Sequence, residues 1–460
     1  MIPTLVSINI GILGLGVVGS DLVNLLTEHH NELIRKTGYN VVIHKIAVLD
    51  VNKPRKCSIN GITLTNNAYD VIQDPKIDII IELIGGIDMP AQYIFAAISE
   101  GKHIITANKA LIAEHGNKIL SSAKEKNVVV VFEAAVCGGL PILKILREGL
   151  SGNKIRSIVG VLNGTGNYIL TKMLDDGISF NCALEQAQKL GYAEANPNND
   201  IQGIDSVQKL SILASIAFGT DVKYKDVHTE GISHINSLDL LCAKEMGCVI
   251  KHLAYAEKDN AYIRLHVHPT LISNIHKLAE IDGVMNGIMI EAEPVGHTFY
   301  YGAGAGGRAT SSAIIADLID IIRTINSPGS RDYLYSEFIA SLNYLYESIE
   351  DLNFSYYVRI PCPLLESDIR VVANRYGIRI IKFEQVRNLT GIDDLSVILI
   401  IDRTIEKTMK HFILELHNDC VVDTSIITFR MHDHHFALQP KALPDFKDAQ
   451  MKSLLNTEYA

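Results

Sequence analysis

The stretch VSINIGILGLGVVGSDLVNLL, residues 6–26, decides the fold of the first part of this chain. It reads as a buried apolar strand, a glycine turn and an amphipathic helix. In the turn, Gly14 allows a tight bend, Gly16 lets backbone approach a pyrophosphate, and Gly19 permits close helix packing. The helix start offers N–H groups and a positive dipole to phosphates, although a turn without a ligand is the alternative. The predicted cofactor contacts are Gly14, Gly16, Val17, Val18 and Gly19.

More strands alternate with helices after this turn. The predicted strands are VVIHKIAVLD (41–50), IDIIIELIG (77–85), KHIITAN (102–108) and VVVVFEAAV (128–136). Such alternation gives right-handed βαβ units and a parallel sheet. We therefore predict an α/β fold whose first domain, residues 1–135, is a Rossmann-type dinucleotide-binding domain.

The pattern becomes mixed from residue 136 onward. AYIRLHVHPTL (261–271) and GIMIEAEPV (287–295) alternate between apolar and polar residues and predict antiparallel strands among helices. We expect an α+β substrate-binding and dimerisation domain over 136–325. Its last part, 300–325, is expected to pack back on the first domain.

A polar stretch, INSPGSRD (325–332), marks a further boundary. Beyond it, four predicted strands have helical stretches between the first two and between the last two. This pattern predicts a small α+β module over 350–431, followed by a short polar tail at 432–460.

Composition excludes several classes of protein. A net charge of −10 without a basic stripe argues against a nucleic-acid partner. The seven cysteines contain no CxxC pair and favour reduced thiols, and no apolar run reaches the ~18 residues that a membrane span needs. The histidine runs at 266–269 and 432–436 have no carboxylate or cysteine at ligand spacing, so we expect no metal there. We expect a cytoplasmic protein.

The residue closing the second strand should contact the adenosine ribose of the cofactor. Asp50 stands there and favours the free 2′-hydroxyl of NAD. Lys53, Arg55 and Lys56 follow and could instead hold the 2′-phosphate of NADP. The sequence leaves both cofactors open.

Two lysines are candidates for chemistry. Asn108 and Lys109 follow the fourth strand, at the sheet edge where such folds bind ligands, although Lys109 could also be a solvated helix-start charge. In GYAEANPNNDIQGIDSVQKLSILASIAFG (191–219) we predict one helix from an N-cap at Asp200 to a stop at Gly219, with Asp205 and Lys209 on its apolar stripe. A surface ion pair is the alternative explanation of that spacing.

Glycine turns supply further candidate sites. FEAAVCGGLPILK (132–144) places the carboxylate of Glu133 before a turn whose carbonyl oxygens suit a hard cation, or the turn is a hinge between domains. VLNGTGNYIL (161–170) and YGAGAGGRATSS (301–312) fit either phosphate or carboxylate binding or plain turn chemistry.

Four of these motifs together resemble the homoserine dehydrogenase family. They are the glycine motif at 11–20, ELIGG with GKHIITANKALIA at 82–113, FEAAVCGGLPI at 132–142, and GYAEANPNNDIQGIDSVQKL at 191–210. The resemblance covers residues 1 to about 325. It implies reversible NAD(P)-dependent reduction of L-aspartate 4-semialdehyde to L-homoserine, on the route to threonine, methionine and isoleucine.

The resemblance also implies roles for single residues. Lys209 and Lys109 match the two catalytic lysines, with Asp205 beside Lys209. The substrate contacts are Glu194, Tyr192, Asp200, Gly164 and Thr165. The remaining cofactor contacts are Asp50, Lys53, Arg55, Asn108, Lys109, Gly304 and Gly306. A sodium site matches Glu133 with the backbone of Val136, Gly138 and Leu140.

The module at 350–431 resembles an ACT domain, a small fold through which threonine inhibits many family members. The Asp- and Gly-containing segment of such domains is Pro361-Cys362-Pro363-Leu364-Leu365 here, so threonine is a doubtful effector and dimerisation is the favoured role. We expect a monofunctional enzyme that forms a homodimer or homotetramer. The alternative is a catalytically silent protein that senses nucleotide and amino acid.

Overall fold

The computed structural model describes residues 6–259, 261–325, 344–361, 364–387, 395–419 and 426–432. The chain forms two compact units. The first unit comprises Met1–Ile158, Val207–Asp226 and Ile290–Tyr344, and the second comprises Val159–Ser206, Val227–Met289 and Leu345–Ala460. The units therefore interleave along the chain. Nearly all of the predicted boundary at 325–332 and of the tail at 432–460 lies outside the described residues.

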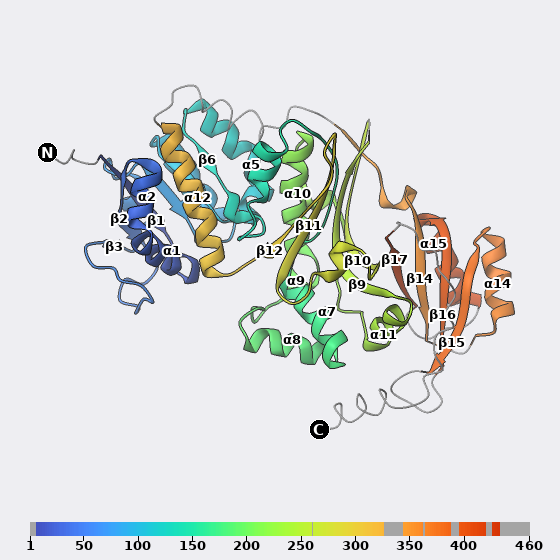
Figure 1. Ribbon diagram of the computed structural model, residues 1–460. Helices are drawn as coiled ribbons and strands as arrows, with labels where there is room; N and C mark the ends of the chain where they lie inside the picture. Colours follow the sequence, from blue (N-terminus) through green and yellow to red (C-terminus); the bar gives the residue numbers. More distant parts are fainter. Residues whose placement is uncertain are drawn as a thin grey trace. The chain divides into compact units, whose positions relative to one another are not determined.

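The first unit contains a parallel sheet of order β3-β2-β1-β4-β5-β6 (Figure 1). Its strands are β1 (Ser7–Leu13), β2 (Asn40–Ala47), β3 (Thr63–Thr65), β4 (Ile79–Glu82), β5 (His103–Thr106) and β6 (Val130–Val131). The intervening helices are α1 (Val17–Glu28), α2 (His30–Thr37), α3 (Tyr69–Ile72), α4 (Asp88–Ser99) and α5 (Lys109–Glu125). This strand order is that of dinucleotide-binding sheets, so the Rossmann-type prediction is confirmed. The short polar strand β3 was not predicted.

Helix α12 (Gly307–Ile325) shares the core of this sheet. Ile314 and Leu318 are fully buried in the same cluster as Ile10 of β1. Ser311 Oγ also donates to the carbonyl oxygen of Val18 in α1 at 3.0 Å. The C-terminal part of the first unit is thus tied to the start of the chain, and α12 lies beside α1 in Figure 1.

The second unit combines helices with a mixed sheet. Its helices before residue 260 are α7 (Gly164–Asp176), α8 (Phe180–Lys189), α9 (Asn198–Ile201) and α11 (Ser237–Glu245). Its strands before the C-terminal module are β8 (His228–Thr229), β9 (Cys248–Lys258), β10 (Tyr262–Ser273) and β13 (Leu345–Tyr346). β9 pairs with β10 in the antiparallel sense, whereas β8 and β13 are parallel to β10.

Several elements lie at the borders of the units. β7 (Lys154–Val161), β11 (Met285–Glu293) and α10 (Ile204–Phe218) run from one unit into the other, and β12 (Gly296–Ala303) belongs to the first. The predicted strands at 261–271 and 287–295 are confirmed by β10 and β11.

The C-terminal module has the element order β-α-β-β-α-β. The elements are β14 (Asn353–Ile360), α14 (Glu366–Arg375), β15 (Ile380–Arg387), β16 (Leu395–Ile405), α15 (Glu406–Asp419) and β17 (Ile427–Met431). The strands are ordered β17-β14-β16-β15, with antiparallel neighbours, and Phe412 and Leu416 of α15 are fully buried in the module's core. All four predicted strands and both helices are present, which is the split βαβ arrangement.

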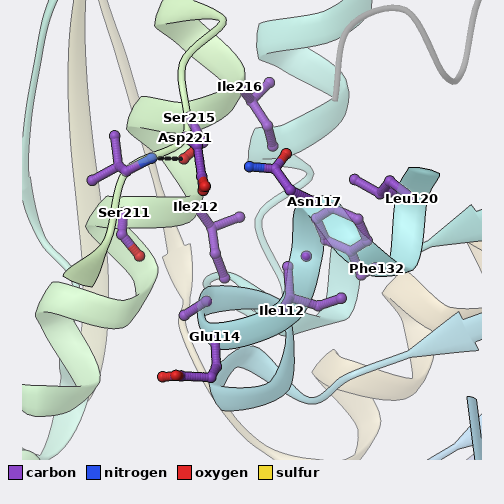
Figure 2. Close-up of a pocket in the computed structure, with 13 residues that line it drawn as sticks. Ile112, Glu114, Asn117, Leu120, Phe132, Ser211, Ile212, Ser215, Ile216 and Asp221 are labelled. Carbon is purple, nitrogen blue, oxygen red and sulfur yellow. Dashed lines mark hydrogen bonds between the residues drawn. The ribbon is translucent and has the colours of Figure 1, made fainter. Parts of the chain in front are cut away.

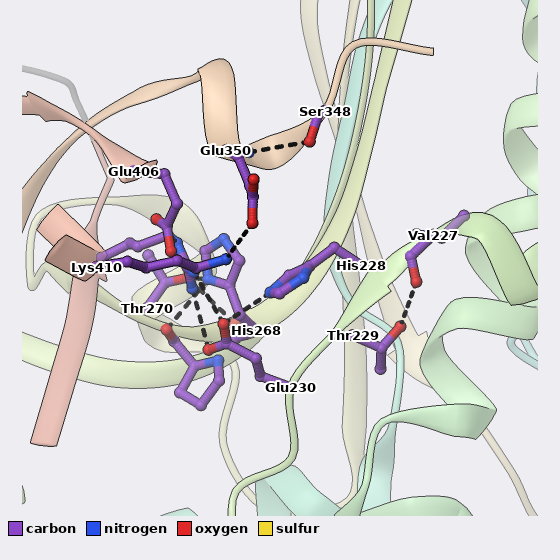
Figure 3. Close-up of polar contacts among 12 residues, drawn as sticks. Val227, His228, Thr229, Glu230, His268, Thr270, Ser348, Glu350, Glu406 and Lys410 are labelled. Carbon is purple, nitrogen blue, oxygen red and sulfur yellow. Dashed lines mark hydrogen bonds and ion pairs between the residues drawn. The ribbon is translucent and has the colours of Figure 1, made fainter. Parts of the chain in front are cut away.

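A buried ion cluster fixes β17 to the loop after β8. The Arg430 guanidinium donates to both carboxylate oxygens of Glu230 and to both of Glu406. Figure 3 shows Glu230 also contacting His228, whose ring nitrogen lies 2.7 Å from the carboxylate. Burial alone would raise the pKa of Glu230, but the hydrogen bonds from His228 and Arg430 outweigh it and lower that pKa.

One predicted helix is broken in the structure. Gly203 adopts φ +82°, so α9 stops at Ile201 and α10 begins at Ile204. The prediction of Asp200 as the N-cap of the long helix is therefore wrong, because Asp200 lies within α9 and a left-handed residue separates it from α10. The predicted stop is confirmed, since α10 ends at Phe218 and Gly219 has φ +66°.

Candidate functional site

The turn between β1 and α1 is shaped for close approach of a ligand. Gly14 has φ +100°, and a Cβ there would lie 2.7 Å from the carbonyl oxygen of Leu83. A Cβ at Gly19 would lie 2.6 Å from the carbonyl oxygen of Gly14, whereas one at Gly16 would meet nothing within 4 Å. Gly16 is the N-cap of α1 and provides no side-chain cap. Open space at Gly16 and an uncapped helix start fit a pyrophosphate.

The loop after β2 lies next to this turn. The Arg55 guanidinium donates to the carbonyl oxygens of Leu15 (3.1 Å) and of Asp50. The Asp50 carboxylate accepts from the N–H of Asn52 at 2.9 Å. Arg55 therefore ties the ribose-side loop to the glycine turn, while Lys53 is exposed.

A polar network that sequence reasoning missed lies at the ends of β4 and β5. The buried Glu82 carboxylate accepts from the Ile84 N–H (2.7 Å) and from the Thr106 hydroxyl (2.6 Å). Thr106 Oγ1 in turn accepts from the N–H of Asn108. The Asn108 side chain caps α5 and donates to the Gly86 carbonyl oxygen. The feature of the sequence that could have indicated this network is Glu82, a charged residue at the end of the apolar strand IDIIIE.

These bonds fix the start of α5, where Lys109 is the first helical residue. Lys109 is half-buried. Because α5 follows β5, Lys109 lies at the carboxyl end of the parallel sheet, where such sheets bind ligands.

Glu133 lies in a fully formed buried turn of the first unit. Its carboxylate accepts from the N–H groups of Leu143 (2.8 Å) and Lys144 (3.0 Å). Its own N–H donates to Asp317 of α12 at 2.9 Å. Burial raises the pKa of Glu133 to about 7, although these backbone hydrogen bonds and the charges of Arg147 and Lys144 oppose the rise.

The same turn contacts the late glycine segment. Gly139 N–H donates to the carbonyl oxygen of Ala303 at 2.9 Å, and a Cβ at Gly138 would lie 3.1 Å from the carbonyl oxygen of Gly304. Val136 and Leu140 are buried. The structure therefore joins the predicted cation turn to the segment of Gly304 and Gly306, just before α12.

Several predicted substrate residues of the second unit meet around the start of α7. The amide of Asn163, the N-cap of α7, donates to the carboxylates of Asp200 and Asp205. The hydroxyl of Thr165 donates to the carbonyl oxygen of Tyr192 at 2.7 Å. For Glu194 the backbone is anchored, because its carbonyl oxygen accepts from Gln188. Asn163 was not predicted as a site residue, although it lies in the quoted VLNGTGNYIL.

Asp205 and Lys209 lie four residues apart in α10. Helical spacing places them on one side of the helix, and their exposed fractions are only 5% and 7%. Such burial contradicts the surface ion pair considered from the sequence. Lys and Asp side chains are rarely buried unless they are paired.

A pocket between α5 and α10 in the first unit does not coincide with the predicted site. Figure 2 shows Ile112 and Asn117 of α5 facing Ile212 and Ser215 of α10. None of the predicted catalytic, substrate or cofactor residues lines it. The helices that carry Lys109 and Lys209 thus pack with a small gap away from those lysines.

Metal-binding clusters and membrane-spanning helices are absent from the described residues. No group of three or more His, Cys, Asp or Glu side chains in this part of the chain is placed to hold a metal ion. Among the helices described, none has the length and apolar character needed to cross a membrane.

Family models and curated relatives that resemble this chain all belong to one family. A family model described as homoserine dehydrogenase, NAD binding domain, matches residues 14–133, and one described as homoserine dehydrogenase matches residues 141–319. The homoserine dehydrogenase of Pseudomonas aeruginosa is 41% identical over 416 residues, covering 89% of this chain and 95% of that protein.

Solved structures agree with these matches. A homoserine dehydrogenase from Thiobacillus denitrificans is 38% identical with a TM-score of 0.87, covering 93% of this chain and 99% of that one. A hyperthermophilic archaeal homoserine dehydrogenase in complex with NADPH is 25% identical with a TM-score of 0.58, covering 70% of this chain and 99% of that one.

Proposed function

The chain belongs to the homoserine dehydrogenase family, and from this premise we propose how its residues divide the interconversion of L-homoserine and L-aspartate 4-semialdehyde. The observation that carries the proposal is the burial of Asp205 and Lys209 at one-turn spacing in α10. Lys209 is the proton donor to the carbonyl oxygen. Lys109 orients the substrate or shares that proton transfer.

The charge that develops on the substrate explains the choice of lysine. A nicotinamide dinucleotide supplies the hydride when bound. Reduction of the aldehyde carbon leaves a developing alkoxide, which an ammonium group stabilises and then protonates. General acid help of this kind is worth about two to four decades in rate.

The second unit supplies complementary groups for the amino-acid part of the substrate. We assign the α-ammonium group to the carboxylates of Glu194, Asp200 and Asp205. Gly164, Thr165 and Tyr192 line the same site. The bonds that join Asn163 to two of these carboxylates, and Thr165 to Tyr192, support a common binding site.

The residues present fit a dinucleotide at the glycine turn. Gly14, Gly16, Val17, Val18 and Gly19 would hold the pyrophosphate, with Asn108, Lys109, Gly304 and Gly306 as further contacts. Asp50 favours NAD, and the exposed Lys53 suits the 2′-phosphate of NADP. Arg55 already donates to two carbonyl oxygens, so its main role is to hold the loop. We propose use of both NADH and NADPH; the archaeal relative bound to NADPH supports the latter.

A sodium ion is a second proposed ligand. Glu133, with the carbonyl oxygens of Val136, Gly138 and Leu140, would hold it and thereby stiffen the glycine turn. The proposed site depends on the buried Glu133 carboxyl, whose pKa burial raises to about 7; its two oxygens already accept from the N–H groups of Leu143 and Lys144, so a cation would share them. A cation would keep that carboxyl ionised near neutral pH.

We propose that the C-terminal module is an ACT-like domain that serves dimerisation. Its β-α-β-β-α-β order supports this assignment. The segment Pro361 to Leu365 lacks both Asp and Gly, which argues against threonine as an effector. The expected assembly is a homodimer or homotetramer.

The test is a steady-state assay of aspartate-semialdehyde-dependent oxidation of NADPH and NADH, side by side. Lys209→Met should lower kcat by about 100-fold or more and leave cofactor affinity unchanged. Lys124→Met, at an exposed position of α5, is the matched control and should behave as the unmodified protein. Near-normal turnover of Lys209→Met would end the assignment, and cofactor binding without turnover by the unmodified protein would favour the sensing alternative.

A further inference from the structure

Asn163 is the polar centre of the substrate residues in the second unit. It follows β7, is only 5% exposed, and is the N-cap of α7. Its Nδ2 donates to Asp200 Oδ1 at 2.7 Å and to Asp205 Oδ2 at 2.8 Å. Its Oδ1 accepts from the N–H of Gly166 at 2.6 Å. One side chain therefore uses both amide hydrogens and its carbonyl oxygen.

The chemistry of these partners fixes the orientation of the amide. Carboxylates only accept hydrogen bonds when ionised, and the Gly166 N–H only donates. A flipped amide would place its oxygen against two carboxylates and its NH₂ group against an N–H. Only the observed orientation satisfies all three partners.

The surroundings hold this amide in place. Asn167, one turn along α7, donates to the carbonyl oxygens of Ile281 and Gly283 at 2.9 Å each. A Cβ at Gly164 would lie 2.6 Å from the carbonyl oxygen of Val284, so the loop after Ile281 lies directly against the start of α7. Because α7 cannot shift easily, the direction of the Asn163 amide is fixed as well.

The two carboxylates reach Asn163 from different helices. Asp200 lies in α9, Asp205 lies in the first turn of α10, and the left-handed Gly203 lies between them. Both carboxylates bond the same NH₂ group, so they lie close together and repel each other. An amide that donates to both offsets the repulsion and fixes which oxygen of each faces away.

We propose that Asn163 is a positioning residue that orients Asp200 and Asp205 toward the amino-acid group of the substrate. This inference rests on the proposed function, which places both aspartates in the substrate site. Asn163 acts through the two carboxylates, and its α7 cap is a separate role of the same side chain.

Two substitutions separate these roles. Asn163→Ser and Asn163→Asp keep an oxygen suited to capping but remove the NH₂ donor. We expect kcat/KM for aspartate semialdehyde and for homoserine to fall by roughly 10- to 100-fold in both variants. Cofactor dissociation constants should stay those of the unmodified protein. Both variants should remain folded at the assay temperature, with a lower thermal unfolding midpoint for Asn163→Asp, which adds a third carboxylate beside Asp200 and Asp205.

Asn236→Ser is the matched control. Asn236 caps α11 in the same unit and accepts from the N–H of Asp239, but bonds neither Asp200 nor Asp205. This variant should keep normal kcat/KM. Near-normal kcat/KM in both Asn163 variants would overturn the positioning role. So would a loss that parallels unfolding or loss of cofactor affinity. Absence of turnover in the unmodified protein would instead contradict the proposed function.

Discussion

The turns that begin α1 and α7 solve the same problem in opposite ways. Both join a strand to a helix whose first N–H groups lack partners within the helix. At α1 the cap is Gly16, which has no side chain, and open space lies where a Cβ would project. At α7 the cap is Asn163, whose side chain bonds Gly166 N–H and reaches two carboxylates.

This difference separates two functions. An uncapped helix start leaves its N–H groups to an anionic ligand, so the first unit can bind cofactor phosphates through backbone. At the capped start of α7 the side chain of Asn163 occupies the N–H of Gly166, and the same side chain organises acidic groups for a cationic part of a ligand. A substitution in the turn before α1 should therefore weaken cofactor binding, and one in the turn before α7 should impair use of the substrate. Neither substitution should affect the other ligand.

The largest effect is expected at Gly203, which sets the geometry of the substrate turn. A Cβ there would lie 2.8 Å from Thr229 Cγ2 and 3.0 Å from His252 Cε1, on a backbone with φ +82°. Gly203→Ala should lower the free energy of unfolding by about 2–5 kcal/mol, from backbone strain and overpacking together. Urea denaturation measures this loss.

Gly247→Ala provides the comparison. Gly247 also has a positive φ, +70°, but a Cβ there would meet only one atom, at 4.0 Å. It should cost only about 1–2 kcal/mol. Equal costs at the two sites would show that Gly203 is not closely packed.

The next effect concerns the pH dependence of stability. His252 is buried against Gly203, its Nε2 lies 2.9 Å from the Glu230 carbonyl oxygen, and burial lowers its pKa to about 4. The unfolded chain takes up this proton near pH 6.5, so the contribution to stability is complete above pH 6.5 and is lost as pH falls toward 4. The loss amounts to about 3 kcal/mol.

His252→Asn should flatten this part of the stability profile, as measured by urea unfolding at several pH values. Glu133 of the first unit changes stability with pH in the opposite direction. Without a bound cation, its raised pKa of about 7 means that the folded state holds the proton more tightly, so its contribution to stability decreases from pH 4.5 to pH 7. Burial also lowers the pKa of His266 to about 3, so His252→Asn should remove only part of the acid loss. A profile unchanged by His252→Asn would contradict the contribution of this histidine.

The smallest of these effects is expected at Gly16. An added methyl group meets no protein atom, so Gly16→Ala should leave the free energy of unfolding nearly unchanged. It should still weaken NADPH and NADH binding by roughly 10- to 100-fold, because it blocks one or two charge-assisted hydrogen bonds to phosphate. Fluorescence titration of the reduced cofactors measures this change, and unaltered affinity would remove Gly16 from the cofactor site.

Local patterns were sufficient for much of the fold. The run of apolar strands and glycine turns predicted the parallel sheet, and the four strands with two helices predicted the C-terminal module. The break at Gly203 was missed because the apolar spacing continues across it. The left-handed backbone and the packing against Thr229 and His252 show that the position requires glycine.

The site was predicted less completely. Lysines and glycines in family motifs could be assigned by matching residues, whereas Asn163 and Glu82 act through partners distant in the sequence. Asn163 meets Asp200 and Asp205 at separations of 37 and 42 residues. Glu82 meets Thr106 at a separation of 24. Such pairings depend on tertiary structure.

The most direct test of the contrast between the two turns measures cofactor affinity and kcat/KM for aspartate semialdehyde, at saturating cofactor, in Gly16→Ala and Asn163→Ser. The account predicts that Gly16→Ala weakens cofactor binding and keeps kcat/KM for the semialdehyde. It predicts the reverse for Asn163→Ser. Parallel loss of both quantities in both variants would contradict the separation of cofactor and substrate roles.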